Sequence, residues 1–489
     1  MTLPFPEYEE HDALGLAALV EKGSVSPDEL LEAALARVQA LNPTLNAVVG
    51  MREDVARAHI KTGLPGGPFK GVPFLLKDLG AEAANFPVSA GSRLFEGSTH
   101  ERDSALVERL NEAGLVTFGR TTAPELGIGA VTEATIYNGP TRNPWDTGRT
   151  PGGSSGGAGA AVAAGIVPAA HGSDGGGSVR IPASSCGLFG FKATRARLPD
   201  GPYAGEGWAG MAIDGFLTRS VRDTAALLDA CAGPDAGAPY VAPPLETSFS
   251  EAMHPRAGLR VALCTTTLTG DAIHADCAEA ATDAAELLED LGHMVEEARP
   301  DTDTCGADTQ AMMVAWTKVV AAGTAASVRA KLASLGRDLR EDDIENVVRD
   351  ACRYAESVSG ADYVDALATI HAYGRDMAAF FERYDVLVTA TLAEPPARIG
   401  RFAHDRESYE DYRLGPDGIF AYSPFCAAFN ASGQPAASVP LHWNGEGLPI
   451  GAHLAAPFGA DLQLMALCAQ LEEARPWFDR RPPLTASTA

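Results

Sequence analysis

Two serines embedded in glycine are the most informative chemical feature of the sequence. Ser154 lies in segment 151–157 (PGGSSGG), and Ser178 follows three glycines in segment 172–182 (GSDGGGSVRIP). Glycine costs backbone entropy on folding and adds nothing to a core, so these runs indicate a need for bare backbone. Backbone N–H groups beside a serine can stabilise the anion formed when that serine attacks a carbonyl. The pattern therefore predicts nucleophilic catalysis by serine.

A serine nucleophile needs a base, and the sequence offers two candidates. His171 lies seven residues before Ser178, and a structural histidine is the interpretation we favour for it. Lys77 follows the apolar segment 72–76 (VPFLL), which we predict to be a buried strand. Burial disfavours the ammonium form, so a lysine at the end of such a strand can be a neutral base. An ordinary surface lysine is the alternative for Lys77.

Other nucleophile and phosphate motifs fit less well. Segment 152–156 (GGSSG) matches the G-x-S-x-G pattern of α/β-hydrolases, but that pattern follows a strand. The preceding segment 141–146 (TRNPWD) cannot form a regular central strand. The sequence contains no S-x-x-K motif and no glycine loop that ends in Gly-Lys-Ser/Thr.

The composition is that of an ordinary globular protein. Of 489 residues, 46% are hydrophobic and 21% charged, and the net charge of −26 argues against binding of nucleic acid or anionic membranes. Segment 1–10 lacks the apolar stretch of a secretory signal, and we find no run as long as a membrane span. The eight cysteines show no C-x-x-C spacing, so we expect reduced thiols and a cytoplasmic protein.

The pattern of apolar residues predicts alternating strands and helices. Ser26, Pro27 and Glu29 form a capping box before a helix at 30–41. Further expected elements are a strand at 71–78, helices at 103–113 and 158–164, a strand at 115–118, a β-α-β unit at 259–297, helices across 308–383, strands at 384–389, 436–440 and 451–454, and a helix at 462–474. We therefore predict one large α/β domain over residues 1–489, whose mixed, mostly parallel, twisted sheet carries helices on both faces.

Taken together, these motifs resemble the amidase signature family. The resemblance rests on Lys77, the segments 152–157, 174–183 and 187–192, and the 24-residue step from Ser154 to Ser178. It extends over residues 10–480, with a signature core at about 70–200 and a substrate-variable helical region at about 305–383. It implies an amidase that hydrolyses a linear or cyclic carboxylic amide, without cofactor or metal. Homodimers are common in the family, so a homodimer is a further expectation.

The resemblance also implies roles for individual residues. Ser178 is the nucleophile, Ser154 is a proton relay with a cis peptide bond to its predecessor, and Lys77 is the base. The oxyanion hole is expected from the backbone N–H groups of Gly175, Gly176, Gly177 and Ser178. The loop is expected to be held by Ser155, Asp174 and Arg180.

Substrate specificity is expected in the segments that vary around the triad, at 79–100, 125–137, 200–216, 305–325 and 415–428. Candidate pocket walls in or near them are Tyr137, Trp208, Trp316, Phe420 and Phe425, with ordinary core packing as the alternative for each. The three glycines before Ser178 predict either a softer loop or room for a bulky acyl group.

Three functions remain open at this point. Segments 170–174, 177–184 and 220–223 resemble those of a bacterial hydrolase within the family that opens a cyclic amide. A glutaminase subunit of an amidotransferase complex is the alternative, because it shares the triad. A binding protein on an inactivated scaffold is the third, and the intact Lys77, Ser154 and Ser178 argue against it.

Overall fold

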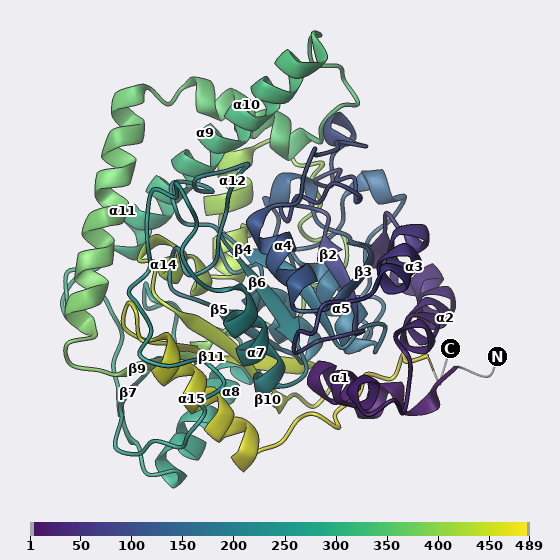
Figure 1. Ribbon diagram of the computed structural model, residues 1–489. Coiled ribbons are helices and arrows are strands. Elements are labelled where there is room, and N and C mark those ends of the chain that lie inside the picture. Colours follow the sequence, from purple (N-terminus) through teal and green to yellow (C-terminus); the bar gives the residue numbers. More distant parts are fainter. Residues whose placement is uncertain (1–3, 487–489) are drawn as a thin grey trace.

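One twisted sheet runs through the whole molecule (Figure 1). The computed structural model describes residues 4–486, so both ends of the expected 1–489 domain lie outside the described residues. The strand order is β1-β3-β2-β4-β6-β5-β10-β11-β9-β7-β8. The strands are β1 (Val48–Val49), β2 (Pro73–Lys77), β3 (Val116–Thr121), β4 (Ala169–Asp174), β5 (Phe189–Lys192), β6 (Ile213–Thr218), β7 (Arg260–Leu263), β8 (Met294–Glu297), β9 (Val386–Ala390), β10 (Ala436–Trp443) and β11 (Pro449–Ala455).

The sheet is mixed, as expected, but it is not mostly parallel. Within residues 4–486, six of the ten strand pairings are antiparallel. The parallel pairings lie in β3-β2-β4 and β9-β7-β8, whereas the strands from β4 through β6, β5, β10 and β11 to β9 alternate in direction. Part of the reason is a hairpin, because β10 and β11 are joined by a short turn and must run antiparallel.

Helices cover the sheet and extend beyond it. They are α1 (Ala13–Glu21), α2 (Pro27–Leu45), α3 (Glu53–Thr62), α4 (Ala105–Glu112), α5 (Gly156–Ala163), α6 (Arg180–Cys186), α7 (Val221–Cys231), α8 (Ala275–Asp290), α9 (Thr309–Leu335), α10 (Asn346–Glu356), α11 (Gly360–Phe380), α12 (Tyr409–Leu414), α13 (Ile419–Tyr422), α14 (Cys426–Ala431) and α15 (Asp461–Ala474). Short 3-10 helices are η1 (Pro6–Glu10), η2 (Arg93–Phe95), η3 (Glu125–Gly127) and η4 (Thr135–Tyr137).

Local signals in the sequence correspond to observed contacts. The Ser26 hydroxyl accepts a hydrogen bond from the Glu29 N–H, and the Glu29 carboxylate accepts one from the Ser26 N–H, so the predicted capping box begins α2. The predicted β-α-β unit is also confirmed, since β7 and β8 pair in parallel and α8 connects them.

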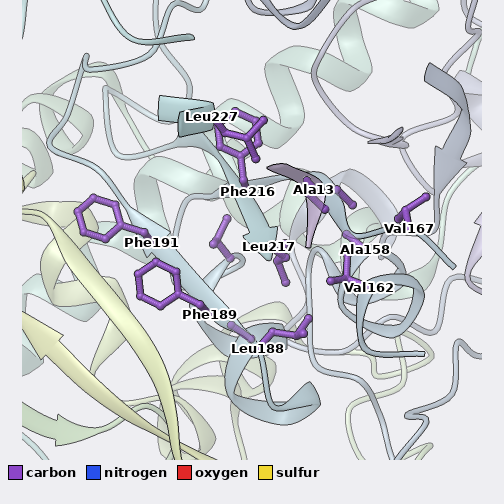
Figure 2. Packing of buried hydrophobic residues seen from close by; sticks show 14 of the residues in the cluster. Ala13, Ala158, Val162, Val167, Leu188, Phe189, Phe191, Phe216, Leu217 and Leu227 are labelled. Atoms are coloured by element: carbon purple, nitrogen blue, oxygen red, sulfur yellow. The ribbon is translucent and has the colours of Figure 1, made fainter. Parts of the chain in front are cut away.

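Part of the hydrophobic core packs on both faces of β6 (Figure 2). Phe216 lies beside Leu227 of α7, while Leu217 points to the other face, toward Ala158 and Val162 of α5. Every residue of α5 is buried, and most of them are glycine or alanine, so this helix can approach the sheet closely. The core therefore holds α5, and with it the preceding Ser154, rigidly against the sheet.

The long helices α9, α10 and α11 gather with α12 at one end of the molecule (Figure 1). Of the described helices, α9 alone is long and apolar enough to cross a membrane, contrary to our expectation for the sequence. Yet 61% of its apolar window is buried inside the structure. A core helix meets the same criterion, so α9 is only weak evidence for a membrane span.

Candidate active site

Three neighbouring strands bring the chemistry to one edge of the sheet. Strands β2 and β4 run in parallel, so Lys77 at the end of β2 and Asp174 at the end of β4 reach the same edge. Strand β6 runs antiparallel to β4 and begins there, with Asp214 opposite Ser173. Ligand sites in α/β proteins commonly lie outside the carboxyl ends of parallel strands.

Lys77 contacts two serines. Its side chain is fully buried, and Nζ donates hydrogen bonds to Ser154 Oγ at 2.7 Å and to Ser173 Oγ at 3.0 Å. Burial lowers the pKa of the Lys77 amine to about 7, although the nearby charges of Asp214 and Asp174 act in the opposite direction. At neutral and alkaline pH a large fraction of Lys77 is therefore neutral and can accept a proton.

Ser154 and Ser178 line the same cavity, which has a volume of about 330 Å³. The peptide bond between Gly153 and Ser154 is cis, as the resemblance implied. A side chain at Gly153 would approach the backbone of Val131 to 2.6 Å, so only glycine fits before Ser154. The site brings all three expected triad residues to one place.

The loop between β4 and α6 is organised around the buried carboxylate of Asp174. Its two oxygens accept hydrogen bonds from the Gly177 and Val179 N–H groups at 2.7 and 3.2 Å and from the Arg180 guanidinium at 2.9 and 3.0 Å. Burial alone would raise the pKa of Asp174, but the Arg180 guanidinium holds it well below its usual range. Asp174 is therefore ionised at any pH relevant to activity.

The hydrogen bond to Asp174 changes the expected oxyanion hole. Because the Gly177 N–H is already donated inside the loop, it is not available to a substrate oxygen. The N–H groups of Gly175, Gly176 and Ser178 remain as candidates. Ser155 supports the same loop, since its N–H donates to the Ser178 carbonyl at 3.2 Å and its hydroxyl contacts the Ser173 backbone.

His171 belongs to the structural frame of the site. Its Nδ1 accepts a hydrogen bond from the Lys77 backbone N–H at 3.2 Å, so the ring proton lies on Nε2, which donates to Asp214 at 3.0 Å. The two hydrogen bonds of the His171 ring therefore go to a backbone N–H and a carboxylate, and neither goes to a serine hydroxyl. His171 links β2, β4 and β6 behind Lys77.

Of the five aromatic residues expected to form the pocket, Trp208 alone lines the cavity in the described part of the chain. Trp316 and Phe420 pack edge to face behind it, and Phe425 lies in the same core cluster. Tyr137 lies elsewhere, where its hydroxyl donates to Asp78 at 2.7 Å. Core packing, the alternative interpretation, thus holds for three of them.

The glycines before Ser178 do not open room for an acyl group. A side chain at Gly175 would come within 2.5 Å of the Trp208 ring, and one at Gly176 within 3.0 Å of the Trp316 ring. The two tryptophans fill this space, so the expectation of a roomier loop is wrong, whereas a softer loop stays a prediction.

The sequence reasoning missed several residues of the site. Ser173 lies inside the recognised segment 172–182 and contacts Lys77, yet nothing in its spacing marks it. The cavity is also lined by three carboxyl groups, those of Glu82, Asp200 and Asp214. Burial, followed by the charges of its acidic neighbours, raises the pKa of Asp200 to about 8. No cluster of three or more His, Cys, Asp or Glu that could hold a metal occurs among residues 4–486.

A second buried lysine offers an internal reference. Burial lowers the pKa of Lys192 to about 7 as well, but its Nζ donates to the Ala193 carbonyl at 3.0 Å. Lys192 does not line the cavity. A depressed pKa alone therefore does not distinguish a base, whereas the contact with Ser154 does.

Comparison with known proteins places this geometry in a family. Residues 29–465 match the amidase family. The 6-aminohexanoate-cyclic-dimer hydrolase of Paenarthrobacter ureafaciens is 37% identical over 482 residues, which cover 97% of this chain and 96% of the relative. An acylamidase of Rhodococcus erythropolis is 34% identical over 485 residues, 96% of each chain.

The same relationship holds in three dimensions. A solved structure of 6-aminohexanoate cyclic dimer hydrolase in complex with substrate superposes with a TM-score of 0.91 at 36% identity, covering 97% of this chain and 99% of the other. The chain therefore belongs to the amidase signature family. It is a hydrolase of the class that acts on carbon–nitrogen bonds other than peptide bonds.

Proposed function

We propose that this protein hydrolyses a small carboxylic amide through an acyl-enzyme on Ser178, with Ser154 as proton relay and Lys77 as base. The observation that carries the proposal is the 2.7 Å contact between the buried Lys77 amine and the Ser154 hydroxyl, beside a cavity that Ser178 also lines. A lysine whose pKa is near 7 can take up and return a proton in each cycle.

The proposed reaction conserves every proton. Ser178 Oγ attacks the amide carbon, its proton passes to Ser154, and the Ser154 proton passes to Lys77. The tetrahedral intermediate then collapses, the carbon–nitrogen bond breaks, and the leaving amine receives a proton back along the same route. Water attacks the resulting ester and loses a proton toward Lys77. The carbon–oxygen bond to Ser178 then breaks, Ser178 Oγ regains that proton through Ser154, and the carboxylic acid is released.

The relatives guide the choice of substrates. Two of them are named for a cyclic dimer of 6-aminohexanoate and for acylamides, and this chain covers nearly their full length. The cavity of about 330 Å³ lies near the lower end of the volumes typical of small-molecule sites. A compact cyclic or short linear amide fits these observations.

The cavity disfavours the glutaminase alternative. Glutamine carries an α-carboxylate, which needs a cationic partner when it is taken from water. Among the described residues, none of those lining the cavity is an arginine or a lysine, and three are acidic. Glutamine would therefore bring its negative charge into a cavity whose described lining residues offer no cationic side chain to pair with it.

The test is amine or ammonia release from a panel of short aliphatic amides, anilides, glutamine and the cyclic 6-aminohexanoate dimer. We expect turnover of at least one neutral amide, complete loss of that turnover in Ser178→Ala, and no turnover of glutamine. Mass spectrometry of the intact protein, quenched during turnover, checks for the acyl group on Ser178. Equal turnover by Ser178→Ala would overturn the proposal, and glutaminase activity would restore the alternative.

A further inference from the structure

In the loop before Ser178, several backbone carbonyls accept hydrogen bonds from residues that do not line the cavity. A trans peptide is planar, so its C=O and N–H point in opposite directions. A donor that binds the carbonyl on one side therefore fixes the direction of the N–H on the other. The cis bonds of the described chain lie elsewhere, at Gly153–Ser154 and Gly201–Pro202.

Three of these carbonyls have such a donor. The Asp174 carbonyl accepts from Asn430 Nδ2 at 2.8 Å, the Gly175 carbonyl from Trp316 Nε1 at 3.2 Å, and the Gly177 carbonyl from the Ile181 N–H at 2.7 Å. The corresponding N–H groups belong to Gly175, Gly176 and Ser178. They are the three that the Gly177–Asp174 bond leaves available for an oxyanion.

Trp316 stands out among the three donors because it is a side chain whose one N–H is given to this carbonyl, whereas Asn430 Nδ2 also binds a carboxylate and a second carbonyl. Its side chain is 3% exposed, and its ring packs edge to face against Trp208 and Phe420, at centroid distances of 5.7 and 5.3 Å. The Arg413 guanidinium lies 5.0 Å from the ring centroid. These contacts fix the indole N–H in its direction toward the Gly175 carbonyl.

From this geometry we infer that Trp316 is a positioning residue of the oxyanion hole: its indole N–H turns the Gly175–Gly176 peptide so that the Gly176 N–H faces the substrate oxygen. This inference rests on the proposed function. It replaces the expected role of Trp316 as a pocket wall, since the residue acts through the loop and does not line the cavity.

The test is Trp316→Phe, which keeps an aromatic ring and removes the N–H. Trp443→Phe is the matched control, because the Trp443 indole nitrogen is buried without a hydrogen-bond partner among the described residues. The Trp443 ring packs against Trp145 and does not line the cavity. Loss of a whole oxyanion donor lowers kcat by about 10²–10³-fold. We expect a misdirected donor to lower kcat by about 10- to 100-fold, with KM within about twofold, and Trp443→Phe to retain wild-type kcat.

A second readout separates positioning from general structural damage. Alkyl and aryl boronic acids form tetrahedral adducts with a catalytic serine and so probe the oxyanion hole directly. We expect Trp316→Phe to weaken boronate inhibition by the same factor as kcat/KM. Unchanged kcat, or lost kcat with unchanged boronate inhibition, would overturn the inference.

A third variant covers failure of Trp316→Phe to fold. Site-specific replacement of Trp316 by β-(3-benzothienyl)alanine keeps the size of the ring and removes only the N–H, with the same expected outcomes. Wild-type turnover and its loss in Ser178→Ala are measured first, so failure of the proposed function is recognised independently of Trp316.

Discussion

The two sides of the cavity are built differently. On the catalytic side, Lys77, Ser154 and Ser178 are at most 8% exposed, and Asp174 gathers five neighbouring donors inside the protein. By the facing side we mean the following half-buried or exposed residues of the lining: Glu82, Asp200, Ala204, Trp208 and Asp214.

This difference separates chemistry from selection. Buried hydrogen bonds fix the catalytic side, so a change there alters the reaction for every substrate. The facing side supplies charge and shape in the more exposed part of the lining, so a change there alters which substrates are preferred. Each of the following experiments tests one side against the other.

The largest effect is expected for Lys77→Met. Removal of the base should lower kcat by about 10²–10⁴-fold for all substrates, the range found for general base catalysis. Lys192→Met is the control, because Lys192 is equally buried and has a similar pKa but contacts no serine hydroxyl in the described structure. Steady-state kinetics measure kcat for both variants, and circular dichroism checks that both are folded. A comparable loss of kcat in Lys77→Met and Lys192→Met would contradict the assignment of Lys77 as the base.

The next largest effect is the pH dependence on the catalytic side. The lowered pKa of Lys77, about 7, means that the amine is neutral above this pH and protonated below it. We expect kcat/KM to fall about tenfold per pH unit below 7 and to level off above about 8. Rates measured from pH 5 to 9, with the fold monitored in parallel, test this. A flat profile down to pH 5 would contradict the role of Lys77.

A smaller effect is expected on the facing side, from Asp200→Asn. The raised pKa of Asp200, about 8, means that its carboxyl is ionised at pH 9 and mostly neutral at pH 7. Glu82, Asp214, Asp235 and Glu206 are the charges that act on it. We expect the wild type to favour an amide bearing a quaternary ammonium over its neutral isostere by about three- to tenfold more at pH 9 than at pH 7.

Asp200→Asn should remove that change and leave kcat for the neutral amide as it was. The ratio of the two substrates at each pH cancels the titration of Lys77. Glu246→Gln is the matched control, because it removes an exposed charge outside the cavity that is not among the charges named as acting on Asp200. An equal response in the control would assign the effect to the overall field of this acidic protein.

The smallest effect on activity is expected far from both sides. Ser26→Ala removes the capping box of α2 and should lower the free energy of unfolding by about 1 kcal/mol. Turnover at 25 °C should stay at the wild-type value, as measured beside a urea titration. A loss of turnover in Ser26→Ala while the fold stays intact would show that the start of α2 influences the active site.

The sequence predicted the catalytic side far better than the sheet that carries it. Lys77 was found because apolar residues precede it on a strand, and the serines were found because glycine surrounds them. The neighbouring strand β4 was not predicted, since its residues (Ala-Ala-His-Gly-Ser-Asp) have little intrinsic preference for a strand. Pairing with β2 and β6 stabilises this segment as a strand, and that pairing cannot be deduced from the residues of the segment itself.

The facing side could not be predicted from local signals. Glu82, Asp200 and Asp214 lie in three separate segments and meet only through the fold. Large aromatic residues were expected to form the walls, but Trp316, Phe420 and Phe425 are buried in the core behind the cavity. Aromatic side chains serve cores and pockets equally well, so residue type alone does not decide between them.

A Cβ atom added at position 175 would lie only 2.5 Å from the Trp208 ring, which links the two sides and makes these positions epistatic. Any larger residue at 175 requires a smaller one at 208, so neither site can be explored alone by mutation. A library that varies both together can reach new acyl specificities through pairs whose single members are inactive. Directed evolution of this enzyme by one substitution at a time would leave those pairs unvisited.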